Sequence, residues 1–218
     1  MPKIKEQRME DMQRYENVLE YTDYEEDSAS PKGKWNKEIF QNEKPIVLEL
    51  ACGKGEYSLN LAQLHPEKNY IGIDIKGNRM WVGATKAQEK DLNNVRYFRA
   101  FIDHLDQFFA AGEISEAWIV FPDPYIKKER KRLTSQKFLK LYRKVFKPGA
   151  IIHLKTDSDL LYEYSKEVIA AEELELLKDI PNVYKTHPDD PVLSIKTFYE
   201  KKHLKEGKSI KYLSFRLD

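Results

Sequence analysis

The chain has 218 residues, of which 41% are hydrophobic and 33% are charged, with a formal net charge of +1 at pH 7. This length suits one well-buried α/β domain with short extensions, and no apolar stretch approaches the ~18 residues that a membrane span needs. The N-terminus lacks the apolar core of a signal peptide, and the single cysteine, Cys52, excludes an internal disulfide framework and a thiolate-rich metal site. We therefore expect a cytoplasmic protein that binds no metal and no membrane.

Strands and helices alternate along most of the chain. Residues 1–31 are polar and charged without a glycine, and they predict a loosely held, flexible N-terminal arm before a single domain at 32–218. Strands are predicted at 45–50, 70–74, 94–100, 117–121 and 150–155, with two further strand-like stretches near 174–178 and 210–217. Helices are predicted at 57–63, 78–90, 102–109, 134–146 and 159–171. This alternation predicts an α/β fold with a doubly wound, mostly parallel sheet of seven strands.

The first strand ends in a glycine turn that has an acidic residue before it. Glu49 precedes Gly53 and Gly55, whose spacing fits neither the dinucleotide fingerprint nor the phosphate-binding P-loop. A carboxylate here repels a pyrophosphate but suits a cationic amino acid group. Asp74, at the end of the second strand, has the position of the acid that accepts ribose hydroxyls, although it also suits a helix N-cap. The pair fits S-adenosylmethionine, which has an ammonium, a sulfonium and a ribose but no phosphate.

A second acidic position follows the strand at 117–121. Asp123 comes where that strand ends, at the edge where open α/β sheets bind ligands, and Pro122 and Pro124 restrict the backbone on both sides. Residues 127–147 then hold ten Lys or Arg against one Glu, whereas residues 16–27 are mostly acidic. This polarity indicates a local basic face for a phosphate backbone, with a solvated helix face as the alternative.

Six motifs together resemble those of the bacterial tRNA (guanine-N7)-methyltransferase family, over roughly residues 32–218. They are Glu49-Leu-Ala-Cys-Gly-Lys-Gly55, Tyr70-Ile-Gly-Ile-Asp74, Phe121-Pro-Asp-Pro-Tyr-Ile-Lys-Lys128, Arg132-Leu-Thr134, His153-Leu-Lys-Thr-Asp157 and Thr197-Phe-Tyr-Glu200. The resemblance implies a Rossmann-like class I methyltransferase fold that uses S-adenosylmethionine to methylate guanine 46 in the variable loop of tRNA.

The resemblance also implies roles for individual residues. Asp123 falls on a catalytic position. The positions that bind the cofactor are Glu49, Gly53, Gly55, Asp74, Phe101 and Asp123. The positions that bind the substrate are Tyr125, Lys127, Lys128, Arg132, Asp157, Thr197, Tyr199 and Glu200.

Four positions depart from the family pattern. Ala51 replaces a glycine of the turn, and Tyr125 and Ile126 replace a Trp-Pro pair but keep an aromatic face for stacking. Phe101 aligns where many members have an acidic or amide residue against the adenine. A backbone amide or stacking would then read the adenine.

Methylation of guanine N7 requires no prior proton removal, because the nitrogen already has an in-plane lone pair. Asp123 would stabilise the charge that develops on the ring, or accept hydrogen bonds from the base, and the sequence leaves both roles open. Lys127, Lys128 and Arg132 would contact the RNA backbone, while Tyr125 would stack on an extruded base.

Two other functions compete with this one. An exocyclic amino N-methyltransferase has an Asp-Pro-Pro-Tyr signature, but a single residue separates Asp123 from Tyr125 here. A non-catalytic RNA-binding protein with the same fold would keep the basic run and lose the cofactor residues, which are intact. A dehydrogenase is disfavoured because the dinucleotide fingerprint is absent. The expected partner is tRNA, and the sequence is compatible with a monomer or a homodimer.

Overall fold

The computed structural model describes residues 2–24 and 30–218. Within these ranges the strands are β1 (Val18–Glu20), β2 (Ile46–Leu50), β3 (Asn69–Asp74), β4 (Val95–Arg99), β5 (Ile114–Val120), β6 (Phe146–Thr156), β7 (Glu175–Ile180) and β8 (Lys211–Arg216). The α-helices are α1 (Pro2–Arg14), α2 (Glu56–Leu64), α3 (Gly77–Glu89), α4 (Leu105–Phe108), α5 (Gln136–Val145), α6 (Asp159–Ala171), α7 (Val183–Thr186) and α8 (Phe198–Lys205). Shorter turns of helix are η1 (Tyr21–Tyr24), η3 (Trp35–Phe40), η4 (Ile102–His104) and η5 (Glu129–Lys131). None of the described helices is long and apolar enough to cross a bilayer.

All the strands belong to one sheet with the order β1-β4-β3-β2-β5-β6-β8-β7. Neighbouring strands are parallel except where β8 inserts antiparallel between β6 and β7. The chain passes from β2 outward to β3 and β4, and later returns to place β5 on the other side of β2. The strand order therefore reverses between β2 and β5, which is where doubly wound sheets bind their ligands.

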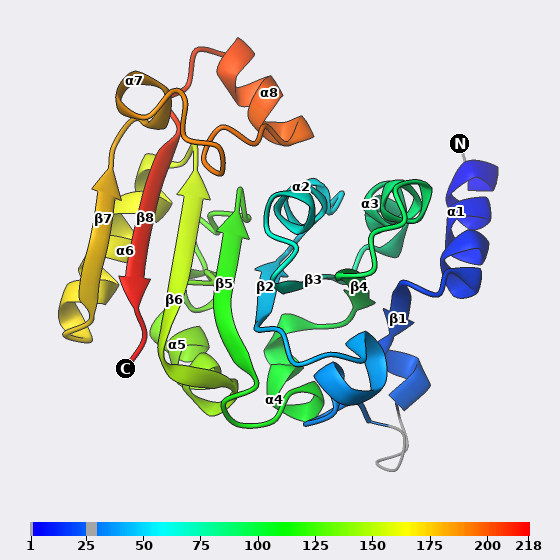
Figure 1. Cartoon of the computed structure of the whole chain (residues 1–218). Coiled ribbons are helices and arrows are strands. Elements are labelled where there is room, and N and C mark those ends of the chain that lie inside the picture. Colours follow the sequence, from blue (N-terminus) through cyan, green and yellow to red (C-terminus); the bar gives the residue numbers. More distant parts are fainter. Residues whose placement is uncertain (1, 25–29) are drawn as a thin grey trace.

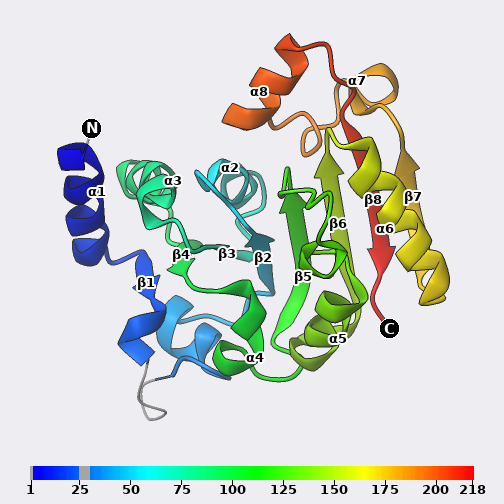
Figure 2. The same cartoon turned by 180° about the vertical axis from the view of Figure 1, so that it is seen from behind.

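Helices cover both faces of the sheet (Figures 1 and 2). Helices α2 and α3 pack on one face over β2, β3 and β4, while α5 and α6 pack on the other face over β6 and β8. The amphipathic α5 shows why the layers form, because its buried side chains recur at helical spacing. They are Phe138, Leu139, Leu141, Tyr142 and Val145. Between the layers, every residue of β2 is buried.

The expected α/β, doubly wound architecture is confirmed, but the sheet has eight strands instead of seven. The additional strand, β1, lies in the predicted N-terminal arm and pairs in parallel with β4. Helix α1 packs on α3, where the Trp81 indole donates to Asp11 (2.9 Å) and Met12 is buried. Three residues of strand and a polar helix carry too little hydrophobic periodicity to be recognised from the sequence. Residues 1 and 25–29 of the arm lie outside the described residues.

One predicted boundary also shifts. The helix expected at 134–146 begins at Gln136 after Ser135, and the Thr134 hydroxyl instead contacts the Ser165 hydroxyl at 2.7 Å. Strand β6 begins at Phe146, four residues before the predicted start of this strand at 150, and continues through Pro148 and Gly149, a pair that commonly breaks a strand. The strand accommodates the break because its pairing with β5 shifts register there and Gly149 adopts a φ of 78°.

Candidate functional site

A cleft of about 960 Å³ lies at the carboxyl ends of the central strands. Four carboxylates that follow or end neighbouring strands line it: Glu49 of β2, Asp74 of β3, Asp123 after β5 and Asp157 after β6. These residues are far apart in the sequence, and the parallel order of the strands brings them to one edge. The environments of the four carboxylates differ, and the differences determine what each can do.

Glu49 is a buried acid that points into the turn after β2. Its side chain is 3% exposed, and one carboxyl oxygen accepts hydrogen bonds from the Ser58 amide (2.7 Å) and the Ser58 hydroxyl (2.5 Å). Burial raises the pKa of Glu49 to about 8, although both Ser58 bonds act in the opposite direction. Burial therefore favours the protonated form of this carboxyl group at neutral pH.

The turn between β2 and α2 presents backbone to the cleft. Ala51 and Gly53 both adopt left-handed φ angles, of 59° and 56°. The Gly53 amide donates to one oxygen of Asp74 (2.9 Å), and the Lys76 amide donates to the other (2.9 Å). Asp74 thus fixes the turn from the neighbouring strand and still faces the cleft.

Gly55 does not line the cleft, although it was predicted to bind the cofactor. A Cβ atom at this position would lie 2.1 Å from the Tyr97 ring, and the residue has a φ of 64°. The Tyr97 hydroxyl donates to the Gly55 carbonyl at 2.9 Å. Packing against Tyr97 therefore explains the glycine.

Apolar side chains line the cleft beyond Asp74. Ile75, Phe101 and Ile102 face it, and the Phe101 ring is 47% exposed. Phe101 makes an edge contact with Tyr21 of η1, with ring centroids 5.7 Å apart. The position predicted to meet adenine is thus an apolar surface that a planar base could stack on.

Asp123 is exposed at the rim of the cleft. The preceding Phe121 has a φ of 49°, and its amide donates to the Lys155 carbonyl at 2.8 Å. Within the described residues, no side chain or amide forms a hydrogen bond or ion pair with the Asp123 carboxylate. Tyr125 follows at the same rim, 37% exposed. An unpaired carboxylate and an open aromatic ring thus face the same space.

Arg132 differs from the prediction. It was expected to contact RNA, but it is 2% exposed and lies behind the loop. Its guanidinium donates to the carbonyls of Pro124 (3.0 Å), Tyr125 (3.3 Å) and Ile126 (3.4 Å), and it lies 4.2 Å from the centre of the Tyr164 ring. Arg132 therefore holds the shape of the Asp123 loop and is not available to a phosphate.

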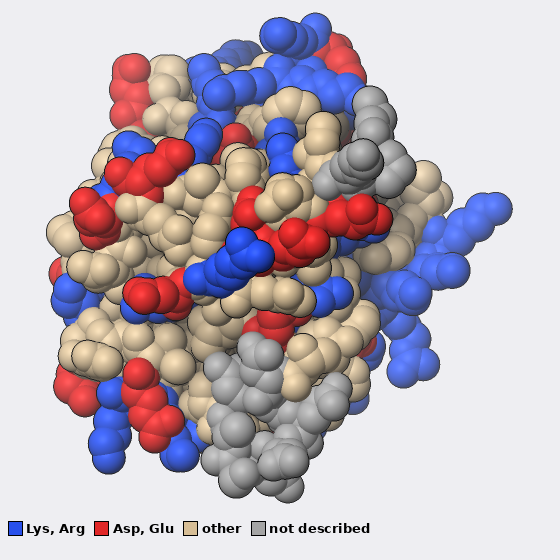
Figure 3. All heavy atoms as spheres, turned by 90° about the vertical axis from the view of Figure 1, so that its right-hand side faces the viewer, with Lys and Arg blue, Asp and Glu red and all other residues tan. Residues whose placement is uncertain are grey.

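The predicted basic residues Lys127 and Lys128 are exposed but outside the cleft, whereas Lys131 and Lys137 line it. Lys137 forms an ion pair with Asp103 across the rim. Figure 3 views the molecule from the α1 side, where Lys and Arg side chains gather at the top and at the right edge, and acidic side chains lie mainly across the middle. Side chains of both charges therefore occur on this face.

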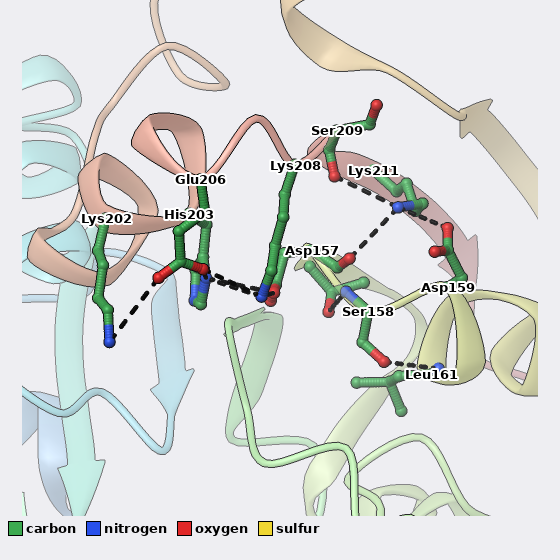
Figure 4. Close-up of polar contacts among 11 residues, drawn as sticks. Asp157, Ser158, Asp159, Leu161, Lys202, His203, Glu206, Lys208, Ser209 and Lys211 are labelled. Atoms are coloured by element: carbon green, nitrogen blue, oxygen red, sulfur yellow. Dashed lines mark hydrogen bonds and ion pairs between the residues drawn. The ribbon is translucent and has the colours of Figure 1, made fainter.

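Asp157 lies in a network of ions between β6 and α8 (Figure 4). One of its oxygens accepts from the Lys208 ammonium (2.7 Å) and lies 3.3 Å from Nδ1 of His203. Lys211 contacts the Asp157 carbonyl (3.3 Å) and the Asp159 carboxylate (2.7 Å). His203 and Lys208 also line the cleft, but they were not predicted because no motif or spacing marks them in the sequence.

The predicted substrate stretch at the start of α8 divides into two groups. Thr197 and Tyr199 line the cleft, and the Thr197 hydroxyl also accepts from the Glu200 amide (3.2 Å) as the helix N-cap. Glu200 has no exposed surface, and its carboxylate bonds to the Lys155 ammonium and the Tyr184 hydroxyl. This corrects the expectation that Glu200 contacts the substrate directly, because a buried and fully paired carboxylate is not accessible.

Comparisons with known proteins agree on a methyltransferase. A family model described as "Putative methyltransferase" matches residues 43–213. The chain is 47% identical to a tRNA (guanine-N(7)-)-methyltransferase of Bacteroides thetaiotaomicron, with 100% of this chain and 87% of that protein covered. It is 43% identical to one of Christiangramia forsetii, covering 99% and 98%, and 38% identical to one of Lactococcus lactis subsp. cremoris, covering 85% of each.

Solved structures show the fold. A 16S rRNA methyltransferase, KamB, superposes with a TM-score of 0.65 at 16% identity, covering 84% of this chain and 92% of that one. A structure described as an antibiotic-related methyltransferase superposes with a TM-score of 0.62 at 20% identity, covering 83% and 92%. The eight-stranded sheet is therefore a Rossmann-like, class I methyltransferase fold.

Proposed function

The chain belongs to the tRNA (guanine-N(7)-)-methyltransferase family, and we propose that it methylates N7 of guanine 46 in tRNA, with S-adenosylmethionine as methyl donor. The observation that carries the proposal is the convergence of Glu49, Asp74, Asp123 and Asp157 on one cleft at the point where the strand order reverses. An enzyme of this family acts where tRNA is found, so we keep the cytoplasm as its proposed location.

The β2 and β3 side of the cleft fits S-adenosylmethionine. Glu49 is a buried carboxyl group that becomes favourable as an anion only beside a cation, which suits the ammonium of an amino acid group. The Asp74 carboxylate accepts hydrogen bonds from two backbone amides, and its remaining lone pairs can accept from ribose hydroxyls. Phe101 offers an apolar surface for a base. When bound, S-adenosylmethionine supplies a methyl group on a positively charged sulfur.

The β5 side of the cleft would hold the guanine. N7 already has a free lone pair, so no residue has to remove a proton, and positioning supplies most of the rate, up to ~7–11 kcal/mol for a well-aligned pair. Asp123 has no partner among the described residues, so its charge is available to stabilise the cationic ring of the product or to accept hydrogen bonds from the base. Tyr125 would stack on the base, and Lys127, Lys128 and Lys131 would contact nearby phosphates.

Methyl transfer to unmodified tRNA tests the proposal. Purified protein is incubated with transcribed tRNA and labelled S-adenosylmethionine, and the nucleosides are identified by mass spectrometry. We expect labelled 7-methylguanosine from the wild type, loss of the label with Asp123→Ala, and retention with the control Asp189→Ala, which changes an exposed aspartate outside the cleft. A tRNA in which guanine 46 is replaced by adenine should gain no label.

Two other results would replace the proposal. Labelled N6-methyladenosine would make the protein an exocyclic amino N-methyltransferase. Tight binding of tRNA without any transfer would make it a non-catalytic RNA-binding protein of the same fold.

A further inference from the structure

Lys155 is a buried cation at the end of β6, one residue before Thr156. Its side chain has no exposed surface, and all three donors of its ammonium are used. They reach the carbonyls of Leu193 (2.6 Å) and Ile195 (3.1 Å) and a carboxylate oxygen of Glu200 (2.9 Å). The other oxygen of Glu200 accepts from the Tyr184 hydroxyl at 2.7 Å. A cation this well paired fixes every group that it touches.

The three partners of the Lys155 ammonium all belong to residues 193–200, which we call the strap. Thr197 and Tyr199 of the strap line the cleft. At its other attachment, the Phe198 amide donates to Glu56 of α2 (2.7 Å), and the Lys54 ammonium lies 3.3 Å from the centre of the Phe198 ring. The strap therefore runs from β6 to the helix that follows the glycine turn, and Lys155 is its buried attachment.

The main chain of Lys155 holds the loop that carries Asp123. Its carbonyl accepts the amide of Phe121, two residues before Asp123. One residue thus joins the strap to the loop that carries the proposed catalytic carboxylate. A shift of Lys155 would move both sides of the guanine site relative to each other.

We propose that Lys155 is a positioning residue for methyl transfer, which holds the strap and the Asp123 loop in register without touching the substrate. The inference rests on the proposed function, which places the guanine against the Asp123 loop, and it adds the strap as a second wall of that site. Buried ion pairs commonly add little net stability over apolar residues of similar size, so stabilisation alone is a weak reason for this pair.

Two variants separate positioning from stability. Lys155→Met leaves the Glu200 carboxylate buried without its cation, so the protein is destabilised and its activity falls. Lys155→Met combined with Glu200→Leu removes the unpaired charge, and we expect its melting temperature to return toward that of the wild type. The strap would still lack its bonds at the Leu193 and Ile195 carbonyls, so kcat/KM for tRNA should stay about 10- to 100-fold low, as expected when reacting groups are displaced by ~1 Å.

The loss should appear in the RNA-dependent steps. We expect the Kd for S-adenosylmethionine, measured by calorimetry, to change by less than about threefold, because Glu49 and Asp74 lie on β2 and β3. Tyr184→Phe is the matched control, since it removes a hydroxyl from the same carboxylate and leaves the three bonds of Lys155 intact. Its kcat/KM should remain within about threefold of the wild type.

Recovery of both melting temperature and kcat/KM in the double variant would overturn the inference and make Lys155 a purely structural residue. If the Met variants fail to fold, Lys155→Gln places two amide donors on a shorter side chain where the ammonium makes three bonds, so kcat/KM should still fall, and wild-type kcat/KM in this variant would refute positioning. Methylation of guanine N7 by the wild type is a separate result, so the inference can fail while the proposed function stands.

Discussion

Binding of S-adenosylmethionine should release a proton from Glu49. This residue is buried, and its pKa of about 8 lies well above the ordinary value of 4.5. At pH 7 the group is about one unit below its pKa, so roughly one molecule in ten carries the charge. If the cationic cofactor binds the ionised form, affinity should rise about tenfold for each pH unit between pH 5.5 and 7, or about 2 kcal/mol over this range.

Calorimetry in two buffers of different ionisation enthalpy measures the proton directly. At pH 6 we expect about one proton to be released for each cofactor bound to the wild type. Glu49→Gln keeps the size of the side chain and an acceptor for Ser58, and it should release none and lose the pH dependence. Glu116→Gln, which changes a partly buried carboxylate outside the cleft, should behave like the wild type.

A ligand control tests the assignment of the ammonium. Methylthioadenosine keeps the nucleoside and the sulfur but lacks the amino acid group, so its binding should release no proton. Equal proton release by the wild type and Glu49→Gln, or an affinity for S-adenosylmethionine independent of pH in the wild type, would refute the reasoning. The burial of Glu49 would then have no part in cofactor binding.

Three further predictions follow from single contacts. Arg132→Lys keeps the charge but not the bonds to three loop carbonyls, so kcat for tRNA should fall at least about tenfold while the salt dependence of tRNA binding stays unchanged. Lys127→Met, by contrast, should lower the slope of log affinity against log salt concentration by about one. A lower slope in Arg132→Lys would mean that Arg132 does contact a phosphate. Gly55→Ala should lower the free energy of unfolding, measured with urea, by about 2–4 kcal/mol because its Cβ atom would collide with Tyr97. The control Gly112→Ala, at a position with a similar φ and open space around it, should lower it by about 1 kcal/mol. Equal losses in the two variants would exclude the collision. Burial opposes the ionisation of Glu116, but His153 and Lys68 outweigh burial and lower the pKa of Glu116 to about 2. The ionised group therefore stabilises the fold above about pH 4.5, and this stabilisation is lost as the pH falls toward 2. Over that range the free energy of unfolding of the wild type should fall by about 3 kcal/mol more than that of Glu116→Gln, and parallel plots of stability against pH would contradict this.

The sequence predicted the parts of the site that local patterns encode. Asp74 and Asp123 follow short apolar strands, and Glu49 precedes a glycine turn, so their place at the ligand edge follows from the alternation of strands and helices. The central strands were recognisable for the same reason, since continuous burial requires continuous apolar runs. A resemblance of motifs then added Asp157, Thr197 and Tyr199 to the same cleft.

Burial of charged residues could not be predicted in this way. Lys155 and Glu200 are 45 positions apart, and Arg132 reaches back to carbonyls that have no sequence signature. In the sequence these three charged residues cannot be distinguished from exposed, substrate-binding residues, because a motif gives the position of a residue but not the direction of its side chain. Only the packing of α8 on β6 and of Arg132 on Tyr164 shows that they support the site from behind.

In the proposed reaction the cleft accepts a cation and a polyanion at once, and the arrangement of its charges suits both. On the β2 and β3 side, burial favours the neutral form of Glu49, and two backbone amides donate to the Asp74 carboxylate, so the negative charge there is reduced before the cofactor arrives. On the opposite side, Lys208 pairs with Asp157 and partly offsets the charge that would otherwise repel a phosphate. Among the four carboxylates, only Asp123 has no hydrogen bond or ion pair with the described residues, and it lies between these two regions, where a guanine ring that becomes positive on methylation would lie. The unpaired state of Asp123 is thus the feature that links the electrostatics of the cleft to the proposed reaction.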